Sequence, residues 1–162
     1  MLAYALSGSV LGVDAYLVRV EVDLARGLPS ISVVGLPQSA VREGRERVTA
    51  ALQNGGFELP PRRITINLAP ADVRKEGSAF DLPIAIGLLA ASGVLPPDAV
   101  AGTCLTGELG LGGELRPVRG VLSLSLRCAQ ERVRSMIVPV GNGAEAAVVE
   151  DVEVAEARTL RD

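Results

Sequence analysis

The chain of 162 residues contains no histidine. A Ser-His-Asp triad, a Cys-His pair and a histidine-ligated zinc site are therefore excluded. Aromatic residues make up only 2% of the chain, so platforms on which nucleic-acid bases could stack are almost unavailable. Hydrophobic residues nonetheless make up 48%, and we expect a core built from Val, Leu, Ile and Ala.

Lysine and cysteine are nearly as scarce. Lys75 is the only lysine and stands between Arg74 and Glu76, which does not match the Gly-Lys-Ser/Thr of a Walker A loop. ATP hydrolysis by that route is excluded for this chain. Cys104 and Cys128 are too few and too far apart for a metal knuckle, and we expect them to be reduced and buried.

Long apolar runs and a basic leader are also missing from the sequence. We therefore expect a cytoplasmic protein that makes no contact with a membrane. The net charge is −3, so the chain as a whole is not expected to attract nucleic acid.

What remains is a clear pattern of strands and helices. Apolar runs and period-two alternation predict strands at residues 3–12, 18–24, 30–36, 64–68, 103–109, 114–118, 136–140 and 152–155. Helical spacing predicts helices from Pro37 to about residue 54, from Asp81 or Leu82 to residue 91, and at 121–133 and 143–150. This order predicts one domain over residues 1–162, an α/β (α+β) two-layer sandwich with a mixed sheet.

Three carboxylates lie in or beside the loop before the second helix: Asp72, Glu76 and Asp81. A divalent-metal cup or an acid/base pair is one interpretation. We favour a structural one, in which Asp81 caps the following helix, worth about 1 kcal/mol. Glu76 then pairs with Arg74 or Lys75, and no metal site is predicted.

Ser78 and Lys75 form a second candidate, a serine–lysine dyad in the same loop. A lysine acts as a base only when desolvation lowers its pKa toward neutrality. Because Lys75 lies between two charged residues, we expect a solvated amine and favour solvent-facing positions for both side chains.

The glycines from Gly107 to Gly113 suggest a phosphate-binding loop at first sight. They lack the G-x-G-x-x-G spacing between a strand and a helix, and they lie between two predicted strands. A hairpin that needs positive φ angles is the better interpretation, so no dinucleotide or other cofactor site is predicted in this chain.

Basic residues flank several strand ends and loops: Arg62 and Arg63, Arg74 and Lys75, Arg116 and Arg119. Gathered on one face, they could contact phosphates without reading sequence. Taken one pair at a time, an ordinary scatter of charge is the simpler interpretation.

Several motifs together resemble the N-terminal domain of magnesium-chelatase-like proteins of the ComM (YifB) type. The matching stretches are residues 35–37, 41–48, 66–72, 74–78, 80–83 and 107–109. The resemblance implies a Lon-peptidase-like fold, that of ribosomal protein S5 domain 2. A similar domain is found at the C-terminal end of the bacterial RadA recombination protein.

In this family the domain precedes an AAA+ ATPase module. The resemblance therefore implies a longer parent protein that binds ATP and Mg, forms a hexameric ring and acts in DNA branch migration during natural transformation. It also implies that the partners of this domain are its own AAA+ module, further copies of the chain and DNA.

Lon-type serine–lysine peptidases offer a residue-by-residue comparison. Their Asp-Gly-Pro-Ser-Ala-Gly loop corresponds to residues 76–81, which places Ala79 at the nucleophile. Their Gly-Gly-Leu-Lys corresponds to residues 119–122, which places Leu122 at the base. A methyl and an isobutyl group cannot perform this chemistry, so we expect no catalytic residue and no enzyme activity.

We therefore expect a non-catalytic accessory domain that helps to assemble the ring or contacts DNA or a partner protein. The residues expected to contact DNA are Arg74, Lys75, Arg116 and Arg119, because the comparison places both of their loops on the side of the former active site. Two alternatives stay open. One is a residual serine peptidase that uses Ser78, and the other is a purely structural oligomerisation module.

Overall fold

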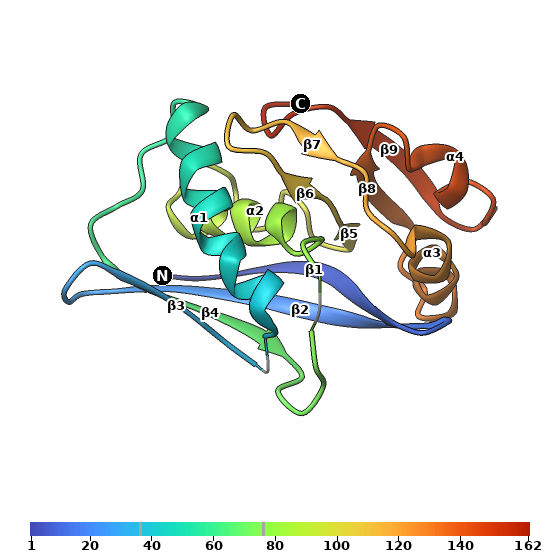
Figure 1. The fold of residues 1–162 in the computed structure, drawn as a ribbon, viewed down its shortest axis with the longest axis horizontal. Coiled ribbons are helices and arrows are strands. Elements are labelled where there is room, and N and C mark those ends of the chain that lie inside the picture. Colours follow the sequence, from blue (N-terminus) through green and yellow to red (C-terminus); the bar gives the residue numbers. More distant parts are fainter. Residues whose placement is uncertain (36, 76) are drawn as a thin grey trace.

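The computed structural model describes residues 1–35, 37–75 and 77–162, which Figure 1 shows as a ribbon. The strands are β1 (Leu2–Leu11), β2 (Asp14–Ala25), β3 (Ser30–Val34), β4 (Arg63–Ala69), β5 (Thr103–Leu105), β6 (Glu108–Leu109), β7 (Leu115–Arg116), β8 (Ser135–Pro139) and β9 (Glu153–Ala157). The helices are α1 (Ser39–Asn54), α2 (Asp81–Ala91), α3 (Val121–Gln130) and α4 (Gly143–Ala146).

Seven of the strands form one mixed sheet in the order β3-β4-β2-β1-β5-β8-β9. The long hairpin of β1 and β2 is antiparallel, as is the pair of β2 and β4. The pairs β3–β4, β1–β5, β5–β8 and β8–β9 are parallel. The predicted mixed sheet is therefore confirmed.

The sheet separates two hydrophobic cores near its middle, where β5 is apolar on both faces: Leu105 belongs to the larger core and Cys104 to the second. A Cβ atom on Gly87 of α2 would lie 2.7 Å from Val22, so α2 packs on that face of β2. A Cβ atom on Gly8 of β1 would collide with Leu124 of α3, and Leu17 belongs to the same second core. Helices thus lie on both faces, where the sequence analysis predicted only two layers.

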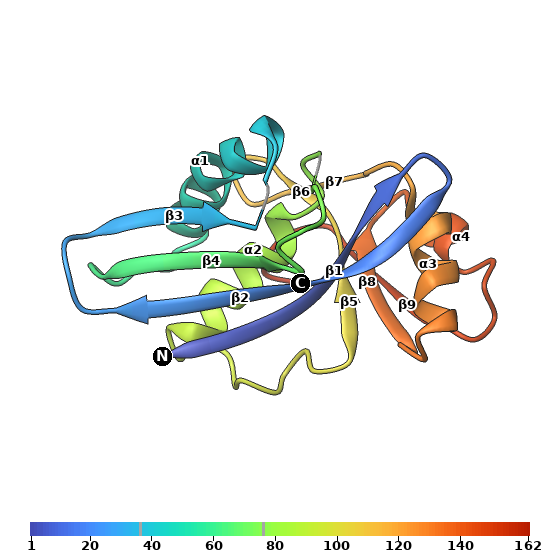
Figure 2. The ribbon, with the colours of Figure 1, turned by 90° about the horizontal axis from the view of Figure 1, so that it is seen from below.

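Helix α2 lies at the centre of the larger core (Figure 1). All its residues except Ile86 are buried, as its uniformly apolar sequence indicates. Helix α1 covers the outer side of α2, whereas the opposite face of β3, β4 and β2 is bare of helices in the described part of the chain (Figure 2).

Several predicted boundaries were wrong. Helix α1 begins at Ser39 because Pro37 forms a bridge with Lys75 instead of the first helical turn. The predicted strand 103–109 is split, since β5 belongs to the large sheet and β6 pairs with β7. Helices α3 and α4 end at Gln130 and Ala146, earlier than predicted. Leu36, the predicted end of the third strand, lies outside the described residues.

The hairpin expected from the glycine cluster is confirmed. Glu108 pairs with Arg116 and Leu109 with Leu115, and Gly113 in the turn has a φ angle of 92°. Among the described residues, no helix combines the length and the apolar character that crossing a membrane requires.

Candidate functional site

A cleft of about 650 Å³ lies where the end of β1, the loop before α2 and the start of α3 meet. Its described walls are residues 8–10, 12, 77–79, 106, 108, 117–121 and 124. The two stretches that the Lon comparison paired, around Ala79 and around Gly120, are far apart in the sequence and line this same cleft.

The loop at residues 77–79 is held in place by backbone hydrogen bonds with the link between β5 and β6. Gly107 N–H donates to the Ala79 carbonyl at 3.0 Å, and Leu82 N–H donates to the Gly107 carbonyl at 3.1 Å. A Cβ atom on Gly107 would lie 3.0 Å from the Leu115 side chain. Glycine therefore lets the loop, the link and the β7 strand pack closely.

Ser78 lies in the cleft beside an acid. Its hydroxyl donates a hydrogen bond to the Glu108 carboxylate, which also lies 3.8 Å from Arg116 Nη1. Arg116 in turn contacts Glu114 at 3.2 Å. The hydrogen-bond partner of the Ser78 hydroxyl is therefore a carboxylate, whose negative charge lies near the Arg116 guanidinium, and not an amine.

Lys75 is fully buried, so the prediction that it faces solvent is wrong. Its Nζ donates hydrogen bonds to the Gly35 carbonyl, at 2.7 Å, and to the Pro70 carbonyl. Burial lowers the pKa of the Lys75 amine, and the Asp72 carboxylate opposes this change. Because the buried amine is bound to these two carbonyls, it is not the hydrogen-bond partner of Ser78 and is not available to a phosphate at the surface.

Asp81 does not cap α2, which corrects another prediction. Phe80 occupies the N-cap position, and Asp81 is buried in the first turn. Its carboxylate accepts hydrogen bonds from Arg47 Nε at 2.6 Å, Arg47 Nη2 at 3.1 Å and Leu109 N–H at 3.1 Å. Burial raises the pKa of the Asp81 carboxyl, and the Arg47 guanidinium counteracts this effect. The side chain therefore joins α1, α2 and β6.

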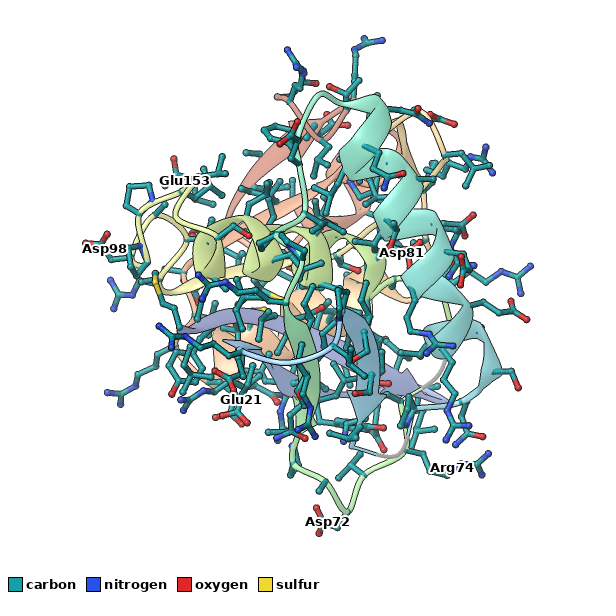
Figure 3. All side chains as sticks on the ribbon, turned by 90° about the vertical axis from the view of Figure 1, so that its left-hand side faces the viewer. Glu21, Asp72, Arg74, Asp81, Asp98 and Glu153 are labelled. Atoms are coloured by element: carbon teal, nitrogen blue, oxygen red, sulfur yellow. The ribbon has the colours of Figure 1, made fainter. Side chains whose placement is uncertain are left out.

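The carboxylates considered for a metal cup are separated in space. Asp72 lies at the exposed tip of the loop after β4, whereas Asp81 lies inside, beside α1 (Figure 3). Within residues 1–35, 37–75 and 77–162, no three His, Cys, Asp or Glu side chains gather as metal ligands would. Glu76 and its expected pairing with Arg74 or Lys75 lie outside the described residues.

The basic residues expected to contact DNA do not form one cluster. Arg119 lines the cleft, and Arg116 stands at its edge through Glu108. Arg74 is exposed and is not among the described residues that line the cleft, and its Nη2 donates to Gln38 Oε1 at 3.2 Å. Arg63 pairs with Ala25 at the opposite end of β2, so Arg62 and Arg63 lie away from the cleft.

Ala79 and Leu122, the positions of nucleophile and base in the Lon comparison, differ in their surroundings. Ala79 is half-buried and is one of the residues that line the cleft. Leu122 is 38% exposed, and the described wall at the start of α3 consists of Gly120, Val121 and Leu124 instead.

The sequence analysis missed Ser9, a polar residue on a buried strand. Ser7 and Ser9 continue the buried face that Ala3 and Ala5 begin. In the described ranges neither serine hydroxyl has a hydrogen-bond partner, and Ser9 lines the cleft. Two hydroxyls at alternate positions of an otherwise apolar strand were the signal available in the sequence.

The chain is similar to a known protein family and to several curated proteins. Residues 20–142 match the family model described as subunit ChlI of Mg-chelatase. Competence protein ComM of Haemophilus influenzae is 46% identical over 161 residues, which cover 99% of this chain and 31% of that protein. YifB of Escherichia coli is 45% identical over 141 residues, or 87% of this chain and 28% of the relative.

A more distant relative is DNA repair protein RadA of Haemophilus influenzae. It is 30% identical over 112 residues, which cover 68% of this chain and 23% of RadA. The chain thus spans less than a third of the length of each of these curated relatives.

Proposed function

Because the chain belongs to the Mg-chelatase ChlI family, within the ComM/YifB group, we propose that it is a non-catalytic accessory domain of a longer AAA+ ATPase. Its work is to contact DNA and to help assemble the ring of the parent protein. We assign ATP and Mg binding to the remainder of that parent.

The cleft supports the proposal that this domain does not cut peptide bonds. Serine–lysine catalysis needs a hydroxyl within hydrogen-bond reach of an uncharged amine. Here the Ser78 hydroxyl donates to Glu108, and the amine of Lys75 is bound to two backbone carbonyls. Ala79 offers only a methyl group to the same space.

The observation that carries the DNA proposal is the placement of Arg119 and Arg116 at the cleft. Arg119 is exposed and lines the cleft, and the Arg116 side chain is 57% exposed. Exposed guanidinium groups bind phosphates without reading sequence. The relatives' names, competence protein and DNA repair protein, agree with a role on DNA.

A salt titration of DNA binding tests the proposal. We expect fluorescently labelled single-stranded or branched DNA to bind the chain at low salt, with affinity falling as salt is raised. Arg116→Ser and Arg119→Ser should each weaken binding and reduce the salt slope by about 1. Arg134→Ser removes the same charge from the exposed residue just before β8, beyond the other end of α3, and should leave binding unchanged.

Two results would overturn the DNA role. One is that the chain binds no DNA at low salt, either alone or within its parent protein. The other is that Arg134→Ser weakens binding as much as Arg119→Ser, which would show an unspecific effect of net charge. If the chain binds no DNA, a purely structural role in oligomerisation is the function that we would then propose.

A residual serine peptidase is the second candidate, because the Ser78 hydroxyl lies in the cleft next to a carboxylate. It requires Ser78 to react with a serine-directed fluorophosphonate.

A further inference from the structure

We propose that an apolar pocket beside the C-terminal residues is filled, in the parent protein, by the segment that follows Asp162. The occupant is thus part of the same polypeptide. This inference rests on the proposed function, because it requires a parent protein that continues beyond residue 162.

The pocket, called the C-terminal pocket below, has a volume of about 480 Å³ and lies on the larger core. Five apolar side chains that pack against this core without being fully buried line the pocket: Phe57, Ile86, Leu95, Val100 and Ile137. The larger core is therefore incompletely covered at this place by the residues that the structure describes.

Helix α2 and the residues after it form the apolar floor and edge of the C-terminal pocket. Ile86 is the one residue of α2 that is not buried, and it lines the pocket. Val94 lines the same pocket and is 52% exposed. A single exposed aliphatic side chain needs no explanation, whereas several that share one hollow indicate a surface that binds another apolar group.

The last residues of the chain form the rim of the C-terminal pocket. Residues 159–162 all line it, and the C-terminus lies next to β7 (Figure 1). Leu115 N–H donates to the Arg158 carbonyl and Leu160 N–H donates to the Gly113 carbonyl, both at 2.8 Å. These bonds fix the end of the chain on the hairpin of β6 and β7, so the next residue of a longer chain starts at the pocket.

The charged groups at the rim are already bound within the chain. Arg161 Nε donates to the Gly55 carbonyl at 2.9 Å. The Asp162 carboxylate accepts N–H groups of Arg158 and Thr159 at 2.8 and 3.1 Å. Arg161 and Asp162 are the charged residues among the described lining residues. An occupant of the pocket is therefore selected by apolar contact and not by charge.

The curated relatives are long enough to supply such an occupant. The chain spans 31% of ComM and 28% of YifB, and in the proposed parent the AAA+ module follows this domain. A segment attached at the rim is present at a high effective concentration beside the pocket. It therefore has an advantage over any separate apolar molecule in filling it.

Val94→Cys and Leu126→Cys form a matched pair for the test. The two side chains are 52% and 49% exposed, but only Val94 lines the C-terminal pocket, since Leu126 lies on α3. The natural thiols of Cys104 and Cys128 are 0% exposed and should react slowly with Ellman's reagent. Peptide mapping by mass spectrometry assigns the labelled positions.

Each variant is made in the 162-residue chain, in that chain extended by the next ~20 residues of its gene, and in the parent protein. About 20 residues are long enough to cross the pocket as a helix or as extended chain. We expect Val94→Cys to be labelled about tenfold more slowly in both longer proteins, as expected for a site that opens only transiently. Leu126→Cys should keep its rate.

A second substitution tests the apolar contact itself. Ile86→Glu places a carboxylate in the pocket, where burial by the following segment would remove it from water. Combined with Val94→Cys in the extended chain, it should restore rapid labelling.

Equal labelling of Val94→Cys in all three proteins, or equal protection of both variants, would overturn the proposal. Protection in the parent but not in the extended chain would show that another part of the parent fills the pocket. Protection within the 162-residue chain that increases with its concentration would assign the pocket to a second copy, and would also contradict the proposal.

The proposed function is tested separately by the gene sequence beyond residue 162. If Val94→Cys is protected in the extended chain but no AAA+ module is encoded, the proposed function fails and the filled pocket stands. If the module is encoded and Val94→Cys stays reactive, the pocket proposal alone is wrong.

Discussion

Lys75 Nζ donates a hydrogen bond to the carbonyl oxygen of Gly35 over 2.7 Å, from inside the protein. The same amine is bonded to the Pro70 carbonyl, and the Lys75 carbonyl accepts Gln38 N–H at 2.9 Å. A single lysine thus joins the end of β3, the loop after β4 and the entry to α1. It stabilises the wall that carries the loop at residues 77–79.

Replacing Lys75 with methionine should lower the free energy of unfolding. The variant keeps the aliphatic stem but leaves the carbonyls of Gly35 and Pro70 without their donor, a cost of about 1–3 kcal/mol. Urea unfolding measures the change. Arg134→Met, which removes an exposed charge, should change stability by less than about 0.5 kcal/mol, and an equal loss in the two variants would contradict the role of the buried amine.

The wild type and Lys75→Met should also differ in how their free energies of unfolding depend on pH. Burial lowers the pKa of the Lys75 amine in the folded chain below its usual value of 10.5. At pH values between the lowered pKa of the folded chain and 10.5, the unfolded chain binds a proton at Lys75 more tightly than the folded chain does. The free energy of unfolding of the wild type therefore rises with pH in this range. The wild type should gain stability relative to Lys75→Met as the pH approaches 10.5. Urea titrations across this pH range measure the difference in free energy of unfolding between the wild type and Lys75→Met. A difference that stays constant or narrows would disprove the prediction.

Gly35→Ala should also destabilise the chain. Gly35 has a φ of 101°, and a Cβ atom there would collide with the Leu68 carbonyl oxygen. Gly12 also has a positive φ, of 63°, but nothing lies within 4 Å of its Cβ position. Gly12→Ala should therefore cost only the backbone strain, about 1 kcal/mol, and Gly35→Ala clearly more. Thermal unfolding that ranks the two variants in the opposite order would contradict the close packing at Gly35.

Asp81→Ala should destabilise the packing of α1 against α2. The change leaves the Arg47 guanidinium without its carboxylate and the buried Leu109 amide without an acceptor, at a cost of about 2–3 kcal/mol. Glu131→Ala breaks a surface pair in which Arg127 Nη2 lies 3.1 Å from the Glu131 carboxylate. It should cost at most about 0.5 kcal/mol. Similar losses in both variants, measured by urea unfolding, would argue against the buried bridge.

A serine-reactive fluorophosphonate should fail to label the chain. The Ser78 hydroxyl donates to Glu108, and the Lys75 amine is bound elsewhere, so no uncharged amine activates this hydroxyl. Gel fluorescence and intact mass measure the labelling. Labelling of the wild type that disappears in Ser78→Ala would support the residual peptidase instead.

The sequence alone predicted much of the fold. The period-two alternation of β2 and β4 predicted two strands with one buried face, and the structure contains them as neighbours. The uniformly apolar run of α2 predicted a buried helix, which the structure also contains. The glycines between Gly107 and Gly113 predicted the hairpin of β6 and β7. These features depend on local spacing and turn chemistry, which a linear pattern contains.

The site depended on contacts that the sequence does not display. Lys75 and Asp81 looked like solvated loop and helix-cap residues, because their neighbours in sequence are polar or begin a helix. In the folded chain the partners of Lys75 are Gly35 and Pro70, and those of Asp81 are Arg47 and Leu109. Partners 28–40 residues away, as for Leu109 and Gly35, are decided by chain topology.

Composition by itself therefore determined that sites built on histidine are excluded and that Lys75 is the only lysine. The tertiary structure alone decided where the remaining polar groups lie. It buried the amine of Lys75, left the hydroxyl of Ser9 without a partner in the described chain, and brought Arg119 to the same cleft. The physical reason is that burial and hydrogen bonding depend on which strands and loops become neighbours, and that is settled only when the sheet has formed.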